Sequence, residues 1–178
     1  RPLCIDGLAE LQLENLTQRR SAIKTLLGAL KYLPPVERLA RVEQIAELSG
    51  AALPDDLMMR SDQVVALHHA GMTVGAHTAS HPILAVLDKG AARQEIAQSR
   101  QFLEALLGER VTHFAYPNGV PGRDYTDETV DVVRSLGFDS AVTTGWGAAR
   151  VGCDMHTLPR FTPWDPGRTK FAARLVRN

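Results

Sequence analysis

The chain has 178 residues, enough for one domain with a substantial hydrophobic core. Its 20 basic and 20 acidic residues cancel and only 6% of its residues are aromatic, so we expect neither nucleic acid nor an anionic membrane surface as a partner. No apolar run is long enough to span a bilayer, and Cys4 and Cys153 lack metal-site spacing, so we expect free thiols.

The first 57 residues predict a helical hairpin. Thr17 is a suitable N-cap for a first helix that stops before Pro35, and Pro35 suits the first turn of a second helix that Gly50 ends. Apolar residues recur at helical spacing in both segments. We interpret region 1–57 as a packing or insertion element without chemistry, joined to region 58–178 within one domain overall.

A short apolar run, Met72–Ala76, follows a helix that we expect to be capped by Ser61 and ended by Gly71. The run breaks into Thr and Ser residues and then a proline, which favours a strand that ends there. His77 then lies at the end of the strand. A turn that begins at His77 brings the ring of His81 back beside it.

Neutral imidazole is the commonest protein ligand of borderline divalent metals, so His77 and His81 are candidate metal ligands. A zincin-like protease site is disfavoured, because it requires a Glu directly after the first histidine and the chain has Thr78 there. The spacing alone leaves a second interpretation equally open, in which His77 is bonded to backbone and His81 caps the next helix.

Two helices and two strands are expected in turn after this pair. They are helix Asp88–Leu107, strand Val111–Tyr116, helix Asp127–Leu136 and strand Ser140–Thr144. The repeated order of helix, glycine and strand predicts parallel β/α units, whose strands end at one shared rim. Strand Val111–Tyr116 runs into Pro117, Asn118 and Gly119, a turn that places backbone N–H groups at that rim.

The last third of the chain offers two further candidates. Trp146 lies between glycines just after a predicted strand, where it would form a wall of a binding site or, alternatively, pack within its loop. Arg160 lies on an otherwise apolar segment and is a candidate to bind a carboxylate or the substrate, the alternative being an ordinary surface arginine. Residues Thr169–Val176 are expected to form a terminal helix.

The sequence H-T-A-S-H-P from His77 to Pro82, followed by F-A-Y-P-N-G from Phe114 to Gly119, resembles the polysaccharide deacetylase family. The likeness runs from about Met58 to Trp164. It implies an α/β fold that is a distorted (β/α) barrel, incomplete in this chain, with the helical hairpin as an insertion near its N-terminus. It also implies a hydrolase that removes N-acetyl or O-acetyl groups from a polysaccharide or an oligosaccharide with acetylated amino sugars.

The same resemblance implies the roles of the candidate residues. His77 and His81 would hold a divalent metal, with zinc expected and cobalt, nickel and manganese as alternatives. The metal would activate water for attack on the acetyl carbonyl, and the backbone N–H of Asn118 would stabilise the oxyanion. The implied substrate contacts are Tyr116, Pro117 and Trp146.

The chain also departs from the family pattern. The family takes its third metal ligand and its base from a T-F-D-D motif, and only a faint echo with a single Asp6 is present. We therefore expect that the first strands are missing, which leaves the metal shell incomplete and the activity weak or absent. The arginine of R-x-P-Y is absent, so Arg160 is the candidate catalytic replacement. The family's general acid is a histidine in an L-x-x-H segment, and from Leu158 that position is Phe161. His156 lies on the other side of Leu158, so the identity of the general acid stays open.

Two other functions remain open. The chain could be a non-catalytic carbohydrate-binding or assembly module that kept the fold, or a different metal hydrolase, such as an amidase, that uses Asp6. An upstream T-F-D-D motif would favour the deacetylase, and its absence would favour the binding module. Unpaired sheet edges in an incomplete barrel would permit a homodimer. The sequence leaves the location open between the cytoplasm and the cell envelope of a bacterium.

Overall fold

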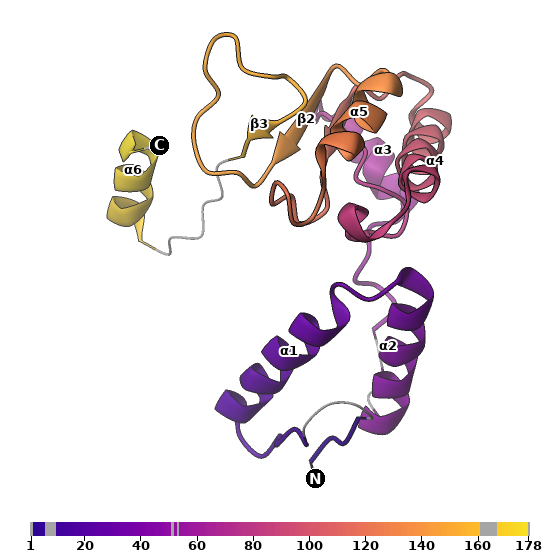
Figure 1. Cartoon of the computed structure of the whole chain (residues 1–178), viewed down its shortest axis with the longest axis vertical. Coiled ribbons are helices and arrows are strands. Elements are labelled where there is room, and N and C mark those ends of the chain that lie inside the picture. Colours follow the sequence, from indigo (N-terminus) through magenta and orange to yellow (C-terminus); the bar gives the residue numbers. More distant parts are fainter. Residues whose placement is uncertain (1, 6–9, 51, 53, 161–166, 178) are drawn as a thin grey trace. The chain divides into compact units, whose positions relative to one another are not determined.

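The computed structural model describes residues 2–5, 10–50, 52, 54–160 and 167–177. The chain divides into two compact units, residues 1–59 and residues 60–178 (Figure 1). The N-terminal unit holds two helices. The C-terminal unit holds a parallel sheet, its covering helices and the histidine pair.

Helix α1 (Leu16–Leu30) begins with a reciprocal cap. The side-chain oxygen of Asn15 accepts from the Gln18 N–H at 3.0 Å, and the side-chain oxygen of Gln18 accepts from the Asn15 N–H at 3.3 Å. The prediction of Thr17 as the cap was wrong. Asn15 holds the first turn instead, so Thr17 already lies inside the helix.

Helix α2 (Pro35–Ser49) has the predicted ends, since Pro35 is its first residue and Gly50 closes it in the left-handed conformation with φ of 60°. The small core of this unit includes a short antiparallel bridge between Leu3 and Leu11. Its buried residues are Leu3, Ile5, Leu11 and Ala22. From the predicted apolar stripe on α2, Ile45 packs against this core.

The C-terminal unit alternates helices and short strands. Its elements are α3 (Ser61–His69), the 3₁₀ helix η1 (Leu84–Val86), α4 (Lys89–Leu107), β1 (His113–Ala115), α5 (Asp127–Ser135), β2 (Ser140–Thr143), β3 (Leu158–Pro159) and α6 (Arg168–Arg177). The predictions of α4, α5 and β2 are confirmed to within one residue at each end. Among the described residues, no helix is both long and apolar enough to cross a membrane.

Helix α3 begins one residue earlier than its predicted cap implies. Arg60 occupies the N-cap position and Ser61 is already helical. The Arg60 N–H donates to the side-chain oxygen of Gln63 at 2.9 Å. The helix ends before Gly71 as predicted, and Gly71 has a left-handed φ of 85°.

The sheet has the order β1, β2, β3, and both strand pairs are parallel, as the sequence predicted. The predicted strand Met72–Ala76 is reduced to a single parallel bridge between Ala76 and Phe114. Ala76 is fully buried whereas Met72 and Thr73 are exposed, so only its last residue pairs with β1. Barrel closure stays a prediction, since the described sheet is a short open one.

The core lies between this sheet and helices α4 and α5. Phe114 of β1 and Ile96 of α4 are at most 1% exposed. Arg100 of α4 donates to the carbonyl oxygen of Leu136 at 2.5 Å, which anchors α4 to the end of α5. Arg100 also pairs with Glu104 at 2.7 Å, and this hydrogen bond lowers the pKa of the Glu104 carboxyl. Helix α4 is therefore anchored to the core and to the end of α5.

Candidate functional site

His77 follows the bridge residue Ala76 and is half-buried. Its Nδ1 lies 2.6 Å from the carbonyl oxygen of Ala115, the last residue of β1. Because a carbonyl oxygen only accepts, Nδ1 must carry the proton in a neutral ring. The lone pair then sits on Nε2, which is the arrangement found when a metal-binding histidine is oriented by a backbone carbonyl.

His81 returns to His77 through a tight turn. The two ring centroids are 4.8 Å apart with an interplanar angle of 73°, so the predicted turn does bring the rings together. The alternative role of His81 as a helix cap is not seen, because Asp88 caps α4 with its carboxylate accepting from the Ala91 N–H at 2.8 Å. The metal role of the pair stays a prediction.

The turn between the histidines is strained. Thr78 and His81 have left-handed φ angles of 66° and 55°, a conformation that is a clear outlier for a β-branched residue such as Thr. Such conformations cost on the order of 1–3 kcal/mol each and persist where surrounding contacts fix them. Here the Thr78 hydroxyl accepts from the His81 N–H at 3.2 Å and donates to the carbonyl oxygen of His77.

Helix α4 supplies contacts to this turn that the sequence predictions missed. Ser99 is 9% exposed, and its hydroxyl accepts from the His77 N–H at 3.3 Å. Glu95, one helical turn earlier, directs its carboxylate at the residues between the histidines. Their spacing of four residues beside the buried Ile96 was the available signal, since such residues share one helix face.

The loop after β1 contains the third left-handed residue that is not glycine, Asn118, with φ of 58°. Its carbonyl oxygen accepts from the Thr144 hydroxyl at 2.8 Å, which ties the loop to the end of β2. Its backbone N–H donates to no acceptor among the described residues. Asn118 lies three residues beyond Ala115, whose carbonyl oxygen holds His77, and its role as an oxyanion donor stays a prediction.

Tyr116 and Pro117, the predicted substrate contacts, are both buried. Tyr116 is 1% exposed, its ring stacks on Tyr125 with centroids 4.0 Å apart, and its hydroxyl donates to the carbonyl oxygen of His156 at 3.0 Å. Burial raises the pKa of both tyrosines. Both side chains therefore pack in the core, and their contact with substrate stays a prediction.

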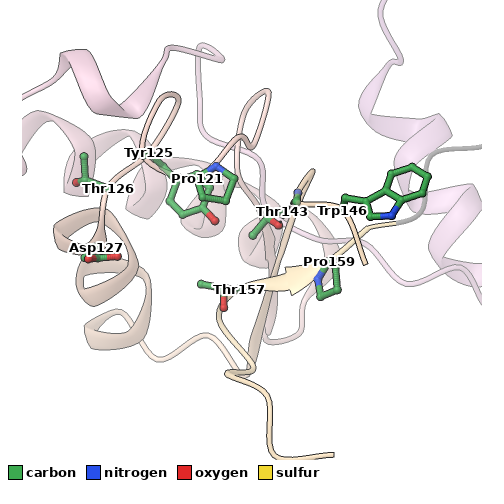
Figure 2. Close-up of a pocket in the computed structure, with 10 residues that line it drawn as sticks. Pro121, Tyr125, Thr126, Asp127, Thr143, Trp146, Thr157 and Pro159 are labelled. Carbon is green, nitrogen blue, oxygen red and sulfur yellow. Dashed lines mark hydrogen bonds between the residues drawn. The ribbon is translucent and has the colours of Figure 1, made fainter. Parts of the chain in front are cut away.

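Trp146 lies in the loop after β2 and is 70% exposed. It borders a cavity of about 520 Å³, and Figure 2 shows Trp146 and Pro159 on one side with Tyr125 and Thr126 on the other. The lining residues are Pro121, Gly122, Tyr125, Thr126, Asp127, Thr143, Gly145, Trp146, Thr157 and Pro159. Arg160 follows β3 directly and is exposed. Both candidates therefore follow the carboxyl ends of strands.

A third metal ligand is not found beside the pair. In the part of the chain that the structure describes, no three His, Cys, Asp or Glu side chains are grouped so as to hold a metal ion. Cys4 and Cys153 are free and exposed, as predicted. Asp6 and Phe161 lie outside the described residues. The His156 Nε2 is 2.9 Å from the Phe138 carbonyl oxygen, which precedes β2, so this histidine belongs to the other end of the sheet.

Residues 43–141, more than half of the chain, match the family described as polysaccharide deacetylase. The chain belongs to the polysaccharide deacetylase family. The matched region begins earlier and ends earlier than the predicted span from Met58 to Trp164, and it includes both histidines and the loop after β1.

The chain is also similar to individual proteins. The putative polysaccharide deacetylase YxkH of Bacillus subtilis is 26% identical over 102 residues, which cover 57% of this chain and 35% of that protein. The Streptococcus pyogenes deacetylase PplD, solved in complex with acetate, is 25% identical with a TM-score of 0.55, over 60% of this chain and 45% of PplD. IcaB from Ammonifex degensii has the same fold, with 22% identity, a TM-score of 0.52, and coverage of 67% and 52%. The chain thus spans about a third to a half of these relatives.

A substitution at Gly119 tests how closely the loop after β1 packs against Thr144. Its φ is 75°, and an added Cβ would lie 3.0 Å from the backbone N of Thr144 and 3.1 Å from the carbonyl oxygen of Tyr116. We expect Gly119→Ala to lower the free energy of unfolding by about 2–4 kcal/mol, combining left-handed strain with overpacking. Denaturant unfolding measures this loss.

Gly108 provides the matched control. It has nearly the same φ, 71°, but an added Cβ meets nothing within 4 Å. Gly108→Ala should therefore cost only the left-handed strain, about 1–2 kcal/mol. Equal losses for the two variants would contradict a tight contact between the loops after β1 and β2.

Proposed function

We propose that this chain is part of a metal-dependent hydrolase that removes N-acetyl or O-acetyl groups from a polysaccharide. The observation that carries the proposal is the close pair of imidazoles of His77 and His81 at the carboxyl edge of a parallel sheet, in a chain of the polysaccharide deacetylase family. Acetate, the ligand of the PplD structure, is the product that such a reaction would release.

The donor set suits a divalent metal in part. Two neighbouring imidazoles, one with its Nδ1 proton donated to a carbonyl oxygen, are ligands typical of zinc, with cobalt, nickel and manganese as alternatives. Further ligands would come from water or from groups other than the described His, Cys, Asp and Glu side chains. When bound, the ion would lower the pKa of water and polarise the acetyl carbonyl.

Side chains and backbone groups of the chain would orient the metal ligand, stabilise the oxyanion and bind the substrate. His77 is oriented before any ligand arrives, because its ring is fixed by Ala115. The Asn118 N–H would donate to the carbonyl oxygen of the acetyl group as negative charge develops there. The exposed face of Trp146 would stack on a sugar ring in the neighbouring cavity, and Arg160 would hold a carboxylate or the substrate at the same edge.

A zinc titration tests the metal part of this proposal. The chain should bind one Zn²⁺, and His77→Ala or His81→Ala should weaken binding by about a hundredfold, since losing a ligand costs at least as much as losing its outer partner. Isothermal titration calorimetry measures the affinity. The double variant of His68 and His69, whose rings are 5.9 Å apart, is the matched control and should bind as the unaltered chain does. A loss of affinity in this control as large as the loss in His77→Ala or His81→Ala would contradict the proposal.

The substrate part is tested at Trp146. Trp146→Ala should weaken binding of an N-acetylglucosamine oligomer about tenfold, equivalent to about 1.4 kcal/mol of lost apolar contact. Val151→Ala is the control, because Val151 is also an exposed apolar residue of the same loop but does not line the cavity. Unchanged affinity in Trp146→Ala would remove Trp146 from the substrate site.

One observation favours a second function, a carbohydrate-binding module without catalysis. Among the described residues, no carboxylate joins the two histidines in a group that could hold a metal ion, and the Glu95 carboxylate is bonded to the turn between them, whereas hydrolysis needs a group that accepts the proton of water. An assay of acetate release from an acetylated oligosaccharide separates the two functions. Release that depends on added metal and on His77 supports the hydrolase, whereas oligosaccharide binding without release supports the module.

A further inference from the structure

The backbone between the two histidines is held by one carboxylate. Oε2 of Glu95 accepts from the N–H groups of Ala79 and Ser80 at 3.0 and 2.9 Å, and Oε1 accepts from the Ser80 hydroxyl at 2.8 Å. The Ala79 N–H also lies 3.1 Å from the backbone carbonyl oxygen of Glu95. Both residues between Thr78 and His81 are thus bonded to one side chain.

Glu95 itself stands on a rigid support. The next residue, Ile96, is fully buried, and Ser99 one turn later accepts from the His77 N–H. Arg100 in turn anchors this part of α4 to the carbonyl oxygen of Leu136. The Glu95 carboxylate is therefore presented to the turn from a fixed position, and the turn must fit it.

These contacts hold a segment whose backbone conformation is locally unfavourable. Thr78 and His81, on either side of the residues bonded to Glu95, are both left-handed, and local backbone preferences oppose that arrangement. Ala79 and Ser80 are exposed, so water could satisfy their N–H groups equally well. Unlike water, the Glu95 carboxylate is attached to α4, so its hydrogen bonds also fix the path of the backbone that leads to His81.

We propose that Glu95 is a positioning residue, which fixes the turn so that the imidazoles of His77 and His81 face a single metal ion. The inference rests on the proposed function for its metal, and on the hydrogen bonds of Glu95 for its geometry. Glu95 acts through the turn and is not itself proposed as a ligand. Hydrogen bonding, rather than negative charge, is its contribution.

Three variants separate these contributions. Glu95→Ala removes all the side-chain acceptors, and Zn²⁺ affinity should fall 10- to 100-fold, the range typical of outer partners of metal ligands. Glu95→Gln keeps an oxygen for the two N–H groups and an amide that can donate to the Ser80 hydroxyl oxygen, so affinity should stay within about threefold. Gln94→Ala, an exposed neighbour on α4, is the control and should change nothing.

Amide hydrogen exchange of the metal-free chain provides a readout that does not depend on the proposed function. The Ser80 amide should exchange at least about tenfold faster in Glu95→Ala than in the unaltered chain, and near the original rate in Glu95→Gln. The Ala79 amide should change less, because it also donates to the backbone carbonyl oxygen of Glu95, which every variant keeps. Failure of the unaltered chain to bind zinc, with this exchange pattern intact, would overturn the proposed metal site and leave the positioning of the turn supported.

The inference itself is overturned by either of two results. Equal exchange rates for these amides in all variants would mean that Glu95 does not hold the turn. Equal losses of zinc affinity in Glu95→Ala and Glu95→Gln would mean that its charge, and not its hydrogen bonding, matters. Thermal unfolding of each variant checks that α4 remains folded, because a general loss of structure would also accelerate exchange at the Ile96 amide.

Discussion

The candidate site depends on the pairing of Ala76 with β1. This single parallel bridge sets the chain leading to His77 beside Phe114, with the Ala76 N–H donating to the carbonyl oxygen of His113 at 2.8 Å and the Ala115 N–H donating to that of Ala76 at 2.9 Å. It places the His77 ring against the last carbonyl of β1, which selects one tautomer and leaves Nε2 free to bind. Without this bridge the His77 ring would lose its place beside β1.

The backbone residues with unfavourable φ angles lie in two loops that are held by side chains of other elements. Thr78, His81 and Asn118 are left-handed and belong to the two loops that follow Ala76 and β1. Each loop is held by a neighbouring element, the first by Glu95 and the second by Thr144. Conformations of this kind survive only where contacts from elsewhere fix them, and such positions cluster at functional sites. The rest of the C-terminal unit supplies those contacts.

Much of this arrangement could be predicted from local patterns. The amphipathic spacing of α4, the glycine that ends α3 and the parallel strand order each depend on residues close in sequence. The reduction of Met72–Ala76 to one bridge could not be predicted in this way, because it depends on how many residues of that run pair with β1, which lies far away in the sequence. The burial of Tyr116 was also missed. Its stacking on Tyr125 comes from a loop that returns to the core, and short-range patterns do not encode that contact.

X-ray absorption at the zinc edge of the zinc-loaded chain tests the central claim most directly. We expect scattering from two imidazole nitrogens at about 2.0 Å, which is the usual zinc to histidine distance, and its loss in the His77→Ala, His81→Ala double variant. Imidazole scattering that persists unchanged in that variant, or its absence from the unaltered chain, would contradict the assignment of His77 and His81 as metal ligands.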